Sequence, residues 1–375
     1  MNIVVLKTHL KDGLEIVEHA IGKSSSLPIL SNVLLSVKKE EVRLSATDLQ
    51  MGITYQFFGT AKEEGGVVFP GYLLGSLLAA SSNEQVSLVV EGQKLQVITG
   101  NHTATIKTLD VEEFPIIPSL EGNESSFEVE ASVLCRGLNQ VVGMAGQSQT
   151  RPEISGVFFA FSKKTARVVA TDSFRLAEKR FLLEKGGEGE QSFILPAKTA
   201  RELISILGER PGKITIHVSP TQVVFDYESQ ENPIKLHIQI VSRIIEGEYP
   251  HYEDVIPSSQ KTRVVVSKAE FINYLKAAGV FAGKTQEVRL TVDPARKEIV
   301  FFSENVDTGN HKAMLAGEID GEEVEVAFNW RFLNEGLAHM RGERIELGIN
   351  GEDGPASVRS TEQEGYVYVI MPIKA

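Results

Sequence analysis

Hydrophobic and polar positions follow two periods along the chain, and both periods return regularly. In the first hundred residues, Leu10, Leu14, Val17 and Ile21 recur every three or four positions, which predicts an amphipathic helix after a short strand at residues 2–6. Short runs with apolar residues at alternate positions follow, and a second apolar helix is predicted over residues 72–80. The pattern therefore predicts two helices set among short strands that turn back on one another.

The same order of elements occurs twice more. Helices are predicted over residues 132–144 and 197–207 in a second copy, and over residues 271–278 and 331–340 in a third. Antiparallel strands with one covered face are typical of such a pattern. We therefore predict an α+β fold of three repeated domains, each with two helices packed on antiparallel sheets. The expected limits of the domains are residues 1–121, 127–248 and 250–375.

Local sequence supports the internal repeat. Ala46-Thr47-Asp48 recurs as Ala170-Thr171-Asp172, in both places directly after a β-rich run. Val67-Val68-Phe69-Pro70 recurs as Phe193-Ile194-Leu195-Pro196, in both places directly before the second helix. An aromatic-Pro pair followed by Ile-Pro also closes the first two copies. Shared order and shared motifs together indicate duplication of one structural unit, although the third copy has lost the Ala-Thr-Asp motif.

Composition sets the class of protein. The chain has 375 residues, 42% of them hydrophobic and 23% charged, which is typical of globular domains that form cores. Only four consecutive apolar residues stand near the start, too few for a signal-peptide core, and no apolar run reaches membrane length. Cys135 is the only cysteine, so no internal disulfide framework exists and a reducing, cytoplasmic location is expected.

Motifs of catalysis are weak in this sequence. Residues 278–285 read Ala-Gly-Val-Phe-Ala-Gly-Lys-Thr, close to a phosphate-binding loop, but a helix is predicted before them and a strand after them, the reverse of the required order. Gly283 is better explained as a helix terminator. Ser258 and Lys261 have the spacing of a Ser-x-x-Lys nucleophile but lie in a polar linker. The eight histidines show no metal-ligand spacing, so neither a cofactor nor a metal is expected.

The charge distribution leaves two interpretations open. The net charge of −12 disfavours a nucleic-acid partner if it is evenly spread. The predicted helices with their flanks are mildly basic, however, and the remainder of the chain is strongly acidic. This is the arrangement that a DNA-facing layer of helices under acidic sheets would need. The alternative is that Lys and Arg simply collect at the C-terminal ends of helices.

Several longer motifs resemble the bacterial β sliding clamp family, the processivity subunits of DNA polymerase III. They are Leu27-Pro28-Ile29-Leu30-Ser31-Asn32, Ala46-Thr47-Asp48-Leu49, Ala170-Thr171-Asp172-Ser173-Phe174-Arg175-Leu176-Ala177, Glu248-Tyr249-Pro250-His251-Tyr252, Ile256-Pro257 and Tyr368-Val369-Ile370-Met371-Pro372-Ile373. The resemblance covers essentially the whole chain. It implies a non-catalytic, homodimeric ring of six domains around duplex DNA. It also implies that the ring tethers the polymerase catalytic subunit, interacts with the clamp loader and with other proteins that carry a clamp-binding motif, and has no membrane partner.

The resemblance also implies three sets of functional residues. One is a hydrophobic groove for a short peptide of each partner, containing Gln and Leu or Phe; its lining would be Ile154, Thr171, Ser173, Phe174, Arg175, Leu176, Pro250, Val255, Phe332, Ser357, Val369, Met371, Pro372 and Ile373. The second set faces the DNA and comprises Lys23, Arg151 and Lys198. The third closes the ring between subunits and comprises Leu74, Leu78, Ile106, Phe271, Ile272 and Leu275.

Some features depart from the family pattern, and other functions stay open at this point. Ser173-Phe174 replaces a common Gly-His pair, Glu153 stands where an aromatic residue is found, and Lys374 replaces a terminal arginine, so the preferred peptide is expected to differ. The apolar helix at residues 72–80 is equally typical of a helix buried in its own domain. A repetitive protein-interaction scaffold that never meets DNA is the alternative function, and a hydrolase would need paired acid–base groups that the sequence does not show.

Overall fold

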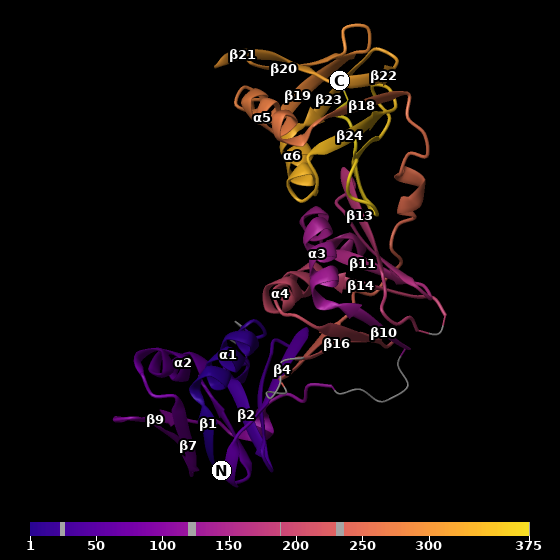
Figure 1. The fold of residues 1–375 in the computed structure, drawn as a ribbon. Coiled ribbons are helices and arrows are strands. Elements are labelled where there is room, and N and C mark those ends of the chain that lie inside the picture. Colours follow the sequence, from indigo (N-terminus) through magenta and orange to yellow (C-terminus); the bar gives the residue numbers. More distant parts are fainter. Residues whose placement is uncertain (23–26, 119–124, 188, 230–235, 375) are drawn as a thin grey trace.

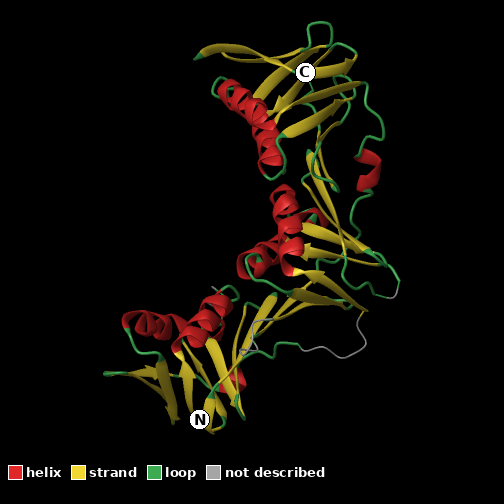
Figure 2. Cartoon of the chain, in the orientation of Figure 1, coloured by secondary structure: helices red, strands yellow, loops and turns green. Residues whose placement is uncertain are grey.

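A computed structural model describes residues 1–375 except 23–26, 119–124, 188, 230–235 and 375. The chain forms three successive α+β units that follow one another along a crescent, with the two termini in the first and third units (Figure 1). Within the described residues each unit contributes two α-helices, and these six α-helices lie on the concave side of the crescent, with the sheets outside them (Figure 2). The predicted α+β class and the three-fold repetition are confirmed.

The first unit contains β1 (Asn2–Leu6), α1 (Lys7–Glu18), β2 (Val33–Lys38), β3 (Glu41–Thr47), β4 (Met51–Phe58), β5 (Thr60–Glu63), β6 (Gly65–Phe69), α2 (Gly71–Ala80), β7 (Gln85–Glu91), β8 (Lys94–Thr99) and β9 (His102–Lys107). Both helices begin directly after a strand, as the sequence pattern predicts. Leu10, Leu14 and Val17 of α1 are fully buried against the strands, which is why the helix forms at this place.

The second unit contains β10 (Ser125–Glu130), α3 (Ala131–Val141), β11 (Gly156–Phe161), β12 (Thr165–Thr171), β13 (Arg175–Leu182), β14 (Gln191–Pro196), α4 (Ala197–Leu207), β15 (Lys213–Val218), β16 (Gln222–Glu228) and β17 (His237–Arg243). The single cysteine lies in α3. The Cys135 thiol is buried, its Sγ is 3.5 Å from the carbonyl oxygen of Leu203 on α4, and burial raises its pKa to about 12. It is a packing residue of the helix pair, since a thiol with a raised pKa forms little thiolate.

The third unit contains β18 (Thr262–Ser267), α5 (Lys268–Gly279), β19 (Glu287–Asp293), β20 (Glu298–Asn305), β21 (Gly309–Ala316), β22 (Glu318–Gly321), β23 (Val324–Asn329), α6 (Trp330–Ala338), β24 (Arg344–Ile349), β25 (Ala356–Ser360) and β26 (Tyr366–Ile370). The Ser267 hydroxyl caps α5 by accepting a hydrogen bond from the Glu270 amide, as the sequence predicts. The glycine-lysine segment lies after α5 and before β19, the order that disfavours a phosphate-binding loop. Helix α5 is capped by Val280, and Gly283, with a φ of 58°, stands in the turn that follows, so the prediction of Gly283 as the helix terminator is wrong by a few residues.

The sheets run across the boundaries between units. Strands β10-β15-β16-β17 of the second unit and β4-β3-β2-β6 of the first form one eight-stranded sheet, joined by antiparallel pairing of β17 with β4. Strands β14-β11-β12-β13 and β26-β25-β24-β18-β22 form a nine-stranded sheet, joined by β13 and β26. The two remaining sheets, β5-β1-β7-β8-β9 and β21-β20-β19-β23, stand at the outer ends of the crescent. The chain therefore has two internal junctions, each crossed by a continuous sheet.

Candidate functional site

A tight turn between β12 and β13 organises the junction of the second and third units. The Asp172 carboxylate accepts hydrogen bonds from the amides of Phe174 and Arg175, both at 3.0 Å. The Thr171 hydroxyl donates to the Arg175 carbonyl at 2.7 Å and accepts from the Ser173 amide at 3.2 Å. Ser173 has a φ of 77°, in the left-handed region where side chains other than glycine are uncommon. The turn is therefore held from within, and its side chains are presented in fixed directions.

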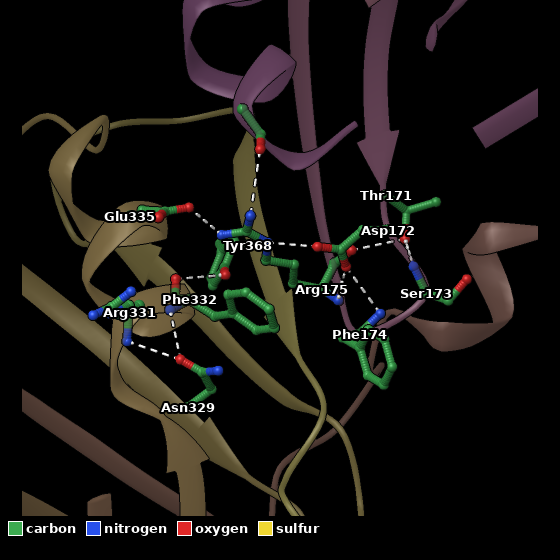
Figure 3. Close-up of polar contacts among 11 residues, drawn as sticks. Thr171, Asp172, Ser173, Phe174, Arg175, Asn329, Arg331, Phe332, Glu335 and Tyr368 are labelled. Atoms are coloured by element: carbon green, nitrogen blue, oxygen red, sulfur yellow. Dashed lines mark hydrogen bonds and ion pairs between the residues drawn. The ribbon is translucent and has the colours of Figure 1, made fainter. Parts of the chain in front are cut away.

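Arg175 connects this turn to the third unit (Figure 3). Its guanidinium donates to the Asp172 carboxylate at 2.8 Å and to Glu335 of α6, and its Cζ lies 4.2 Å from the centroid of the Phe332 ring. Burial alone would lower the pKa of Arg175, but its hydrogen bonds to Glu335 and Asp172 raise it. The side chain is only 9% exposed, and its charged hydrogen bonds to Asp172 and Glu335 link the second unit to the third.

A cavity of about 280 Å³ opens beside the turn, at the seam of the two units. Phe174 and Val255 stand 63% and 39% exposed on its rim, whereas Leu176 and Val369 are buried in its wall. The Met371 amide donates to the Phe174 carbonyl at 2.8 Å and brings the last residues of the chain to the same place. The cavity is lined by Arg151, Thr171, Ser173, Phe174, Arg175, Leu176, Pro250, His251, Tyr252, Val255, Val369 and Met371.

The segment between the second and third units forms one wall of this cavity through an aromatic cluster. Tyr249 stacks on Phe158 with 4.8 Å between ring centroids, and Tyr252 meets the same ring edge-on at 6.3 Å. The Tyr252 hydroxyl donates to the Glu178 carboxylate at 2.7 Å, and burial together with this carboxylate raises the pKa of Tyr252. These contacts fix Pro250 and Val255 against the turn, so the cavity has rigid walls.

Nine of the fourteen residues predicted for the groove line the cavity, and five do not. Ile154 is buried under the turn, Ser357 lies opposite Val369 on β25, and Pro372 is buried. Phe332 lies under Arg175, and Ile373 donates its amide to Ala327 outside the cavity. Arg151, His251 and Tyr252 line the cavity although the groove prediction did not include them; the repeated aromatic-Pro motif pointed to the last two.

Two of the three predicted DNA-facing residues lie in the described part of the chain, in different environments. Lys23 falls outside the described residues. Arg151 is engaged at the cavity, where its guanidinium donates to Glu153 and to the Ser173 hydroxyl, both at 3.1 Å. Lys198 stands on α4 and pairs with Asp48 of the first unit. Exposed cations also occur on five of the six helices, at Lys11, Arg136, Lys198, Arg201, Lys276 and Arg331.

Five of the six residues predicted for a subunit interface are buried within this single chain, so their place in an interface stays a prediction. Leu74, Leu78 and Leu275 are fully buried, and Phe271 and Ile106 are 1% and 5% exposed. Their side chains pack in the cores of the first and third units. Only Ile272 is partly exposed. An apolar surface does stand next to them, where Tyr72 and Leu73 of α2 are 64% and 41% exposed.

The described residues do not show a catalytic or metal centre. Within them, no group of three or more His, Cys, Asp or Glu side chains is placed to hold a metal ion. None of the helices in the described part of the chain is long and apolar enough to cross a membrane. What the junction offers instead is a rigid, mostly apolar cavity with an aromatic rim, which is suited to binding an apolar anchor of another molecule.

Comparison with known proteins gives one consistent result. Family models for the N-terminal, central and C-terminal domains of the DNA polymerase III beta subunit match residues 1–118, 128–251 and 253–374. A beta sliding clamp of Bacillus subtilis is 24% identical, with each chain covered completely, and one of Synechococcus elongatus is 26% identical, with 100% and 99% covered. Among solved structures, the DNA polymerase III beta subunit of Thermotoga maritima is 29% identical with a TM-score of 0.89 and 100% and 99% coverage. The sliding clamp of Bacillus subtilis, at 23% identity, shares the fold with a TM-score of 0.92 and covers 100% and 99%.

Proposed function

The chain belongs to the DNA polymerase III beta subunit family, the non-catalytic sliding clamps that act as processivity factors, and we propose that it works as a closed ring of two copies around duplex DNA. The observation that carries this proposal is the arrangement of the crescent. All six helices lie on the concave side, and the outermost strands β9 and β21 stand at its two tips (Figure 1). Two such crescents joined head to tail through identical contacts would close a ring.

Retention on circular DNA tests the ring. The protein would be loaded onto a nicked plasmid by a clamp loader with ATP, and the DNA-bound fraction isolated by gel filtration. A ring stays with the circle and leaves when a restriction enzyme linearises it. A protein that binds DNA directly stays bound after linearisation, and a scaffold that never meets DNA is not retained in either case. Either of those results would contradict the proposed topology.

We propose that the cavity at the second junction receives a short peptide of the polymerase catalytic subunit, the clamp loader and other clamp-motif proteins. Its apolar wall, its exposed Phe174 and the Met371 side chain suit a peptide anchored by Leu or Phe. Phe174→Ala should weaken binding of a Gln-Leu-Phe-containing peptide by roughly tenfold or more, since truncated anchors commonly lose ~2 kcal/mol. Isothermal titration measures the affinity, and the matched control Phe58→Ala removes another exposed Phe, 47% exposed, on the first unit. Equal losses in both variants would refute the assignment.

We also propose that cations of the concave face contact phosphates loosely, with Lys198 among them, as well as Lys23 by its position in the sequence. Lys198→Ala combined with Arg201→Ala should reduce the slope of log affinity against log salt by about one for each phosphate that is no longer neutralised. Arg296, which is 74% exposed in the turn after β19, is the matched control, because Arg296→Ala removes a cation from a sheet. An unchanged slope in the double variant would exclude these two side chains from DNA contact.

A further inference from the structure

We propose that the first junction carries a second peptide-binding groove, which takes an extended segment of a partner protein with a bulky apolar side chain next to a carboxylate. This groove lies between the first and second units, away from the cavity assigned above. Its residues are Leu49, Gly52, Ile116, Ile117, Arg243 and Ile244, with neighbours from the same three segments. The inference rests on the repeat being preserved in three dimensions.

The groove is organised by the same turn as the cavity at the second junction. The Asp48 carboxylate accepts hydrogen bonds from the amides of Gln50 and Met51 at 3.0 and 2.8 Å. The Thr47 hydroxyl donates to the Met51 carbonyl at 2.8 Å and accepts from the Leu49 amide at 3.0 Å. Leu49 has a φ of 73°, which is close to the φ of 77° at the equivalent residue Ser173. The four hydrogen bonds that the Asp172 carboxylate and the Thr171 hydroxyl form with the backbone thus have counterparts here, whereas the bond from the Arg175 guanidinium to Asp172 has none, because Met51 takes the place of Arg175.

The walls correspond in the same register. Strand β17 sets Val241 opposite Gly52, and the Arg243 amide donates to the Gln50 carbonyl at 2.9 Å. At the second junction, β26 sets Val369 opposite Leu176, and Met371 donates to Phe174 in the same way. The proline-rich segment at residues 115–118 takes the place that residues 250–255 occupy there. The two hollows are therefore two copies of one site.

Substitutions between the copies make the first hollow larger and add polar side chains to its wall, among them Gln50, Gln222 and Arg243. Gly52 stands in the place of Leu176, and the side chain of Ile117 packs directly over it. The volume of the first hollow is about 680 Å³ against 280 Å³ for the second. Ile116 is 93% exposed and Leu49 is 44% exposed at its rim. A leucine in the left-handed region is strained by roughly 1 kcal/mol or more, and such strain concentrates at ligand sites. Here it holds an apolar side chain at the mouth of the groove.

Charge selects the kind of peptide. Arg243 occupies the position of Met371, its side chain is exposed, and it forms no ion pair within the described residues. Glu246 also lines the groove, but it does not pair with Arg243, so the guanidinium is available to a ligand. A guanidinium beside the exposed apolar side chains of Leu49 and Ile116 can bind a carboxylate through paired hydrogen bonds. The matching ligand is a bulky apolar residue followed by a carboxylate, at a chain terminus or on an acidic side chain.

The groove is preformed, because ion pairs connect the two units behind it. Arg210 pairs with Asp12 at 2.6 Å and Lys198 pairs with Asp48, and a hydrogen bond joins His19 Nδ1 to Glu202 at 2.5 Å. Burial alone would raise the pKa of Asp48, but its hydrogen bonds with Lys198 and with the turn lower it, so the carboxylate stays ionised and the turn stays formed. A rigid site loses little binding free energy to ordering.

Methyl NMR tests the proposal on the full-length protein, because the two hollows carry separate probes. Met51, Ile116, Ile117 and Ile244 report on the first groove, and Met371 reports on the second cavity. The probe is N-acetyl-Leu-Phe with a free C-terminal carboxylate, and the matched control is the same dipeptide as its C-terminal amide. We expect saturable shifts of the first group with the acid, and affinity lowered roughly tenfold or more for the amide and in Arg243→Glu, since a charge-assisted hydrogen bond contributes ~1.5–3 kcal/mol.

Two variants separate the possible outcomes. Ile116→Ser alters a side chain that is almost fully exposed, so it should weaken binding without changing the methyl spectrum of the free protein elsewhere. Phe174→Ala should leave binding at the first groove unchanged. Shifts confined to Met371, no shifts at all, or equal affinity of the acid and the amide would each overturn the proposal, while leaving the function assigned to the second cavity intact.

Discussion

The strands at the internal junctions and those at the outer tips of the crescent differ in whether both of their edges are hydrogen-bonded to a neighbouring strand. At the junctions, β17 and β26 are hydrogen-bonded on both sides, within sheets of eight and nine strands. At the tips, β9 and β21 are hydrogen-bonded on one side only, in sheets of five and four strands. An uncovered edge is a template for another strand. The strands at the junctions are thus paired on both sides within one chain, whereas β9 and β21 keep an open edge, and in the proposed ring these are the edges that a second copy would pair with.

A proline in a junction strand should have the largest effect. Gln239 lies on β17 between Thr54 of β4 and Asp226 of β16. Gln239→Pro removes a ladder hydrogen bond and strains the strand, so we expect the free energy of unfolding to fall by about 3 kcal/mol. Urea unfolding measures this, and Gln239→Thr, which keeps the amide proton, is the control. A proline variant as stable as the threonine variant would show that the junction sheet does not hold the units together.

A proline at the tip should instead weaken association. Gly100 and Asn101 form a two-residue turn after β8, so the closing pair of Thr99 and His102 is hydrogen-bonded and the Thr105 amide points away from β8. Thr105→Pro should leave the unfolding free energy of one copy within about 0.5 kcal/mol. It should weaken the dimer by roughly tenfold, because an unpaired backbone group costs about 1–3 kcal/mol.

Sedimentation velocity over a dilution series measures the effect at the tip, and Thr105→Val, which retains the amide, is its control. An unchanged dimer would place the closing contact elsewhere, for example on Tyr72 and Leu73. Leu275→Asp is not a suitable test, because Leu275 is fully buried and a charge there would unfold the third unit.

A histidine in the junction sheet should give the smallest effect. His237 of β17 is hydrogen-bonded to Asp226, and this bond, with Glu228 nearby, raises the pKa of His237 although burial and Arg43 oppose it. The stabilisation is complete below the ordinary pKa of about 6.5 and is lost as the pH rises through the raised value of the folded protein. The urea midpoint of the wild type should therefore fall more between pH 6 and pH 8.5 than that of His237→Gln. Parallel profiles would exclude this pair as a source of pH dependence.

The periodic pattern of the sequence predicted the elements but not how they join. Helices form where the apolar stripes predicted them, since that signal lies within a dozen residues. The pairing of β17 with β4 has no such local signal, because Ile240 pairs with Ile53, almost half the chain away. The sequence of each strand alone indicates only that the strand is half-buried. The shared sheets, and hence the equivalence of the two junction hollows, became visible only in three dimensions.

The same limit applies to the candidate site. Thr171 and residues 173–176 were assigned to the groove through the family resemblance, and they lie together at the cavity. The contact of Arg175 with Glu335 was not predicted, because Glu335 lies 160 residues away and the local sequence gives no signal for it. The apolar residues of α2 and α5 were assigned to an interface, although Leu74 and Phe271 are buried in their own units. Core and interface share one hydrophobic pattern, so the pattern alone does not separate them.

The single thiol of this protein is buried in α3, so the surface carries no reactive cysteine. Because Cys135 is the only cysteine and its pKa is raised, cysteines introduced on β9 and β21 would be the only reactive thiols. Disulfides between them would turn two crescents into one covalent loop. A loop formed on a closed plasmid would be a mechanically interlocked pair of circles. Denaturant would release neither partner, and only a reducing agent or a cut in the DNA would part them.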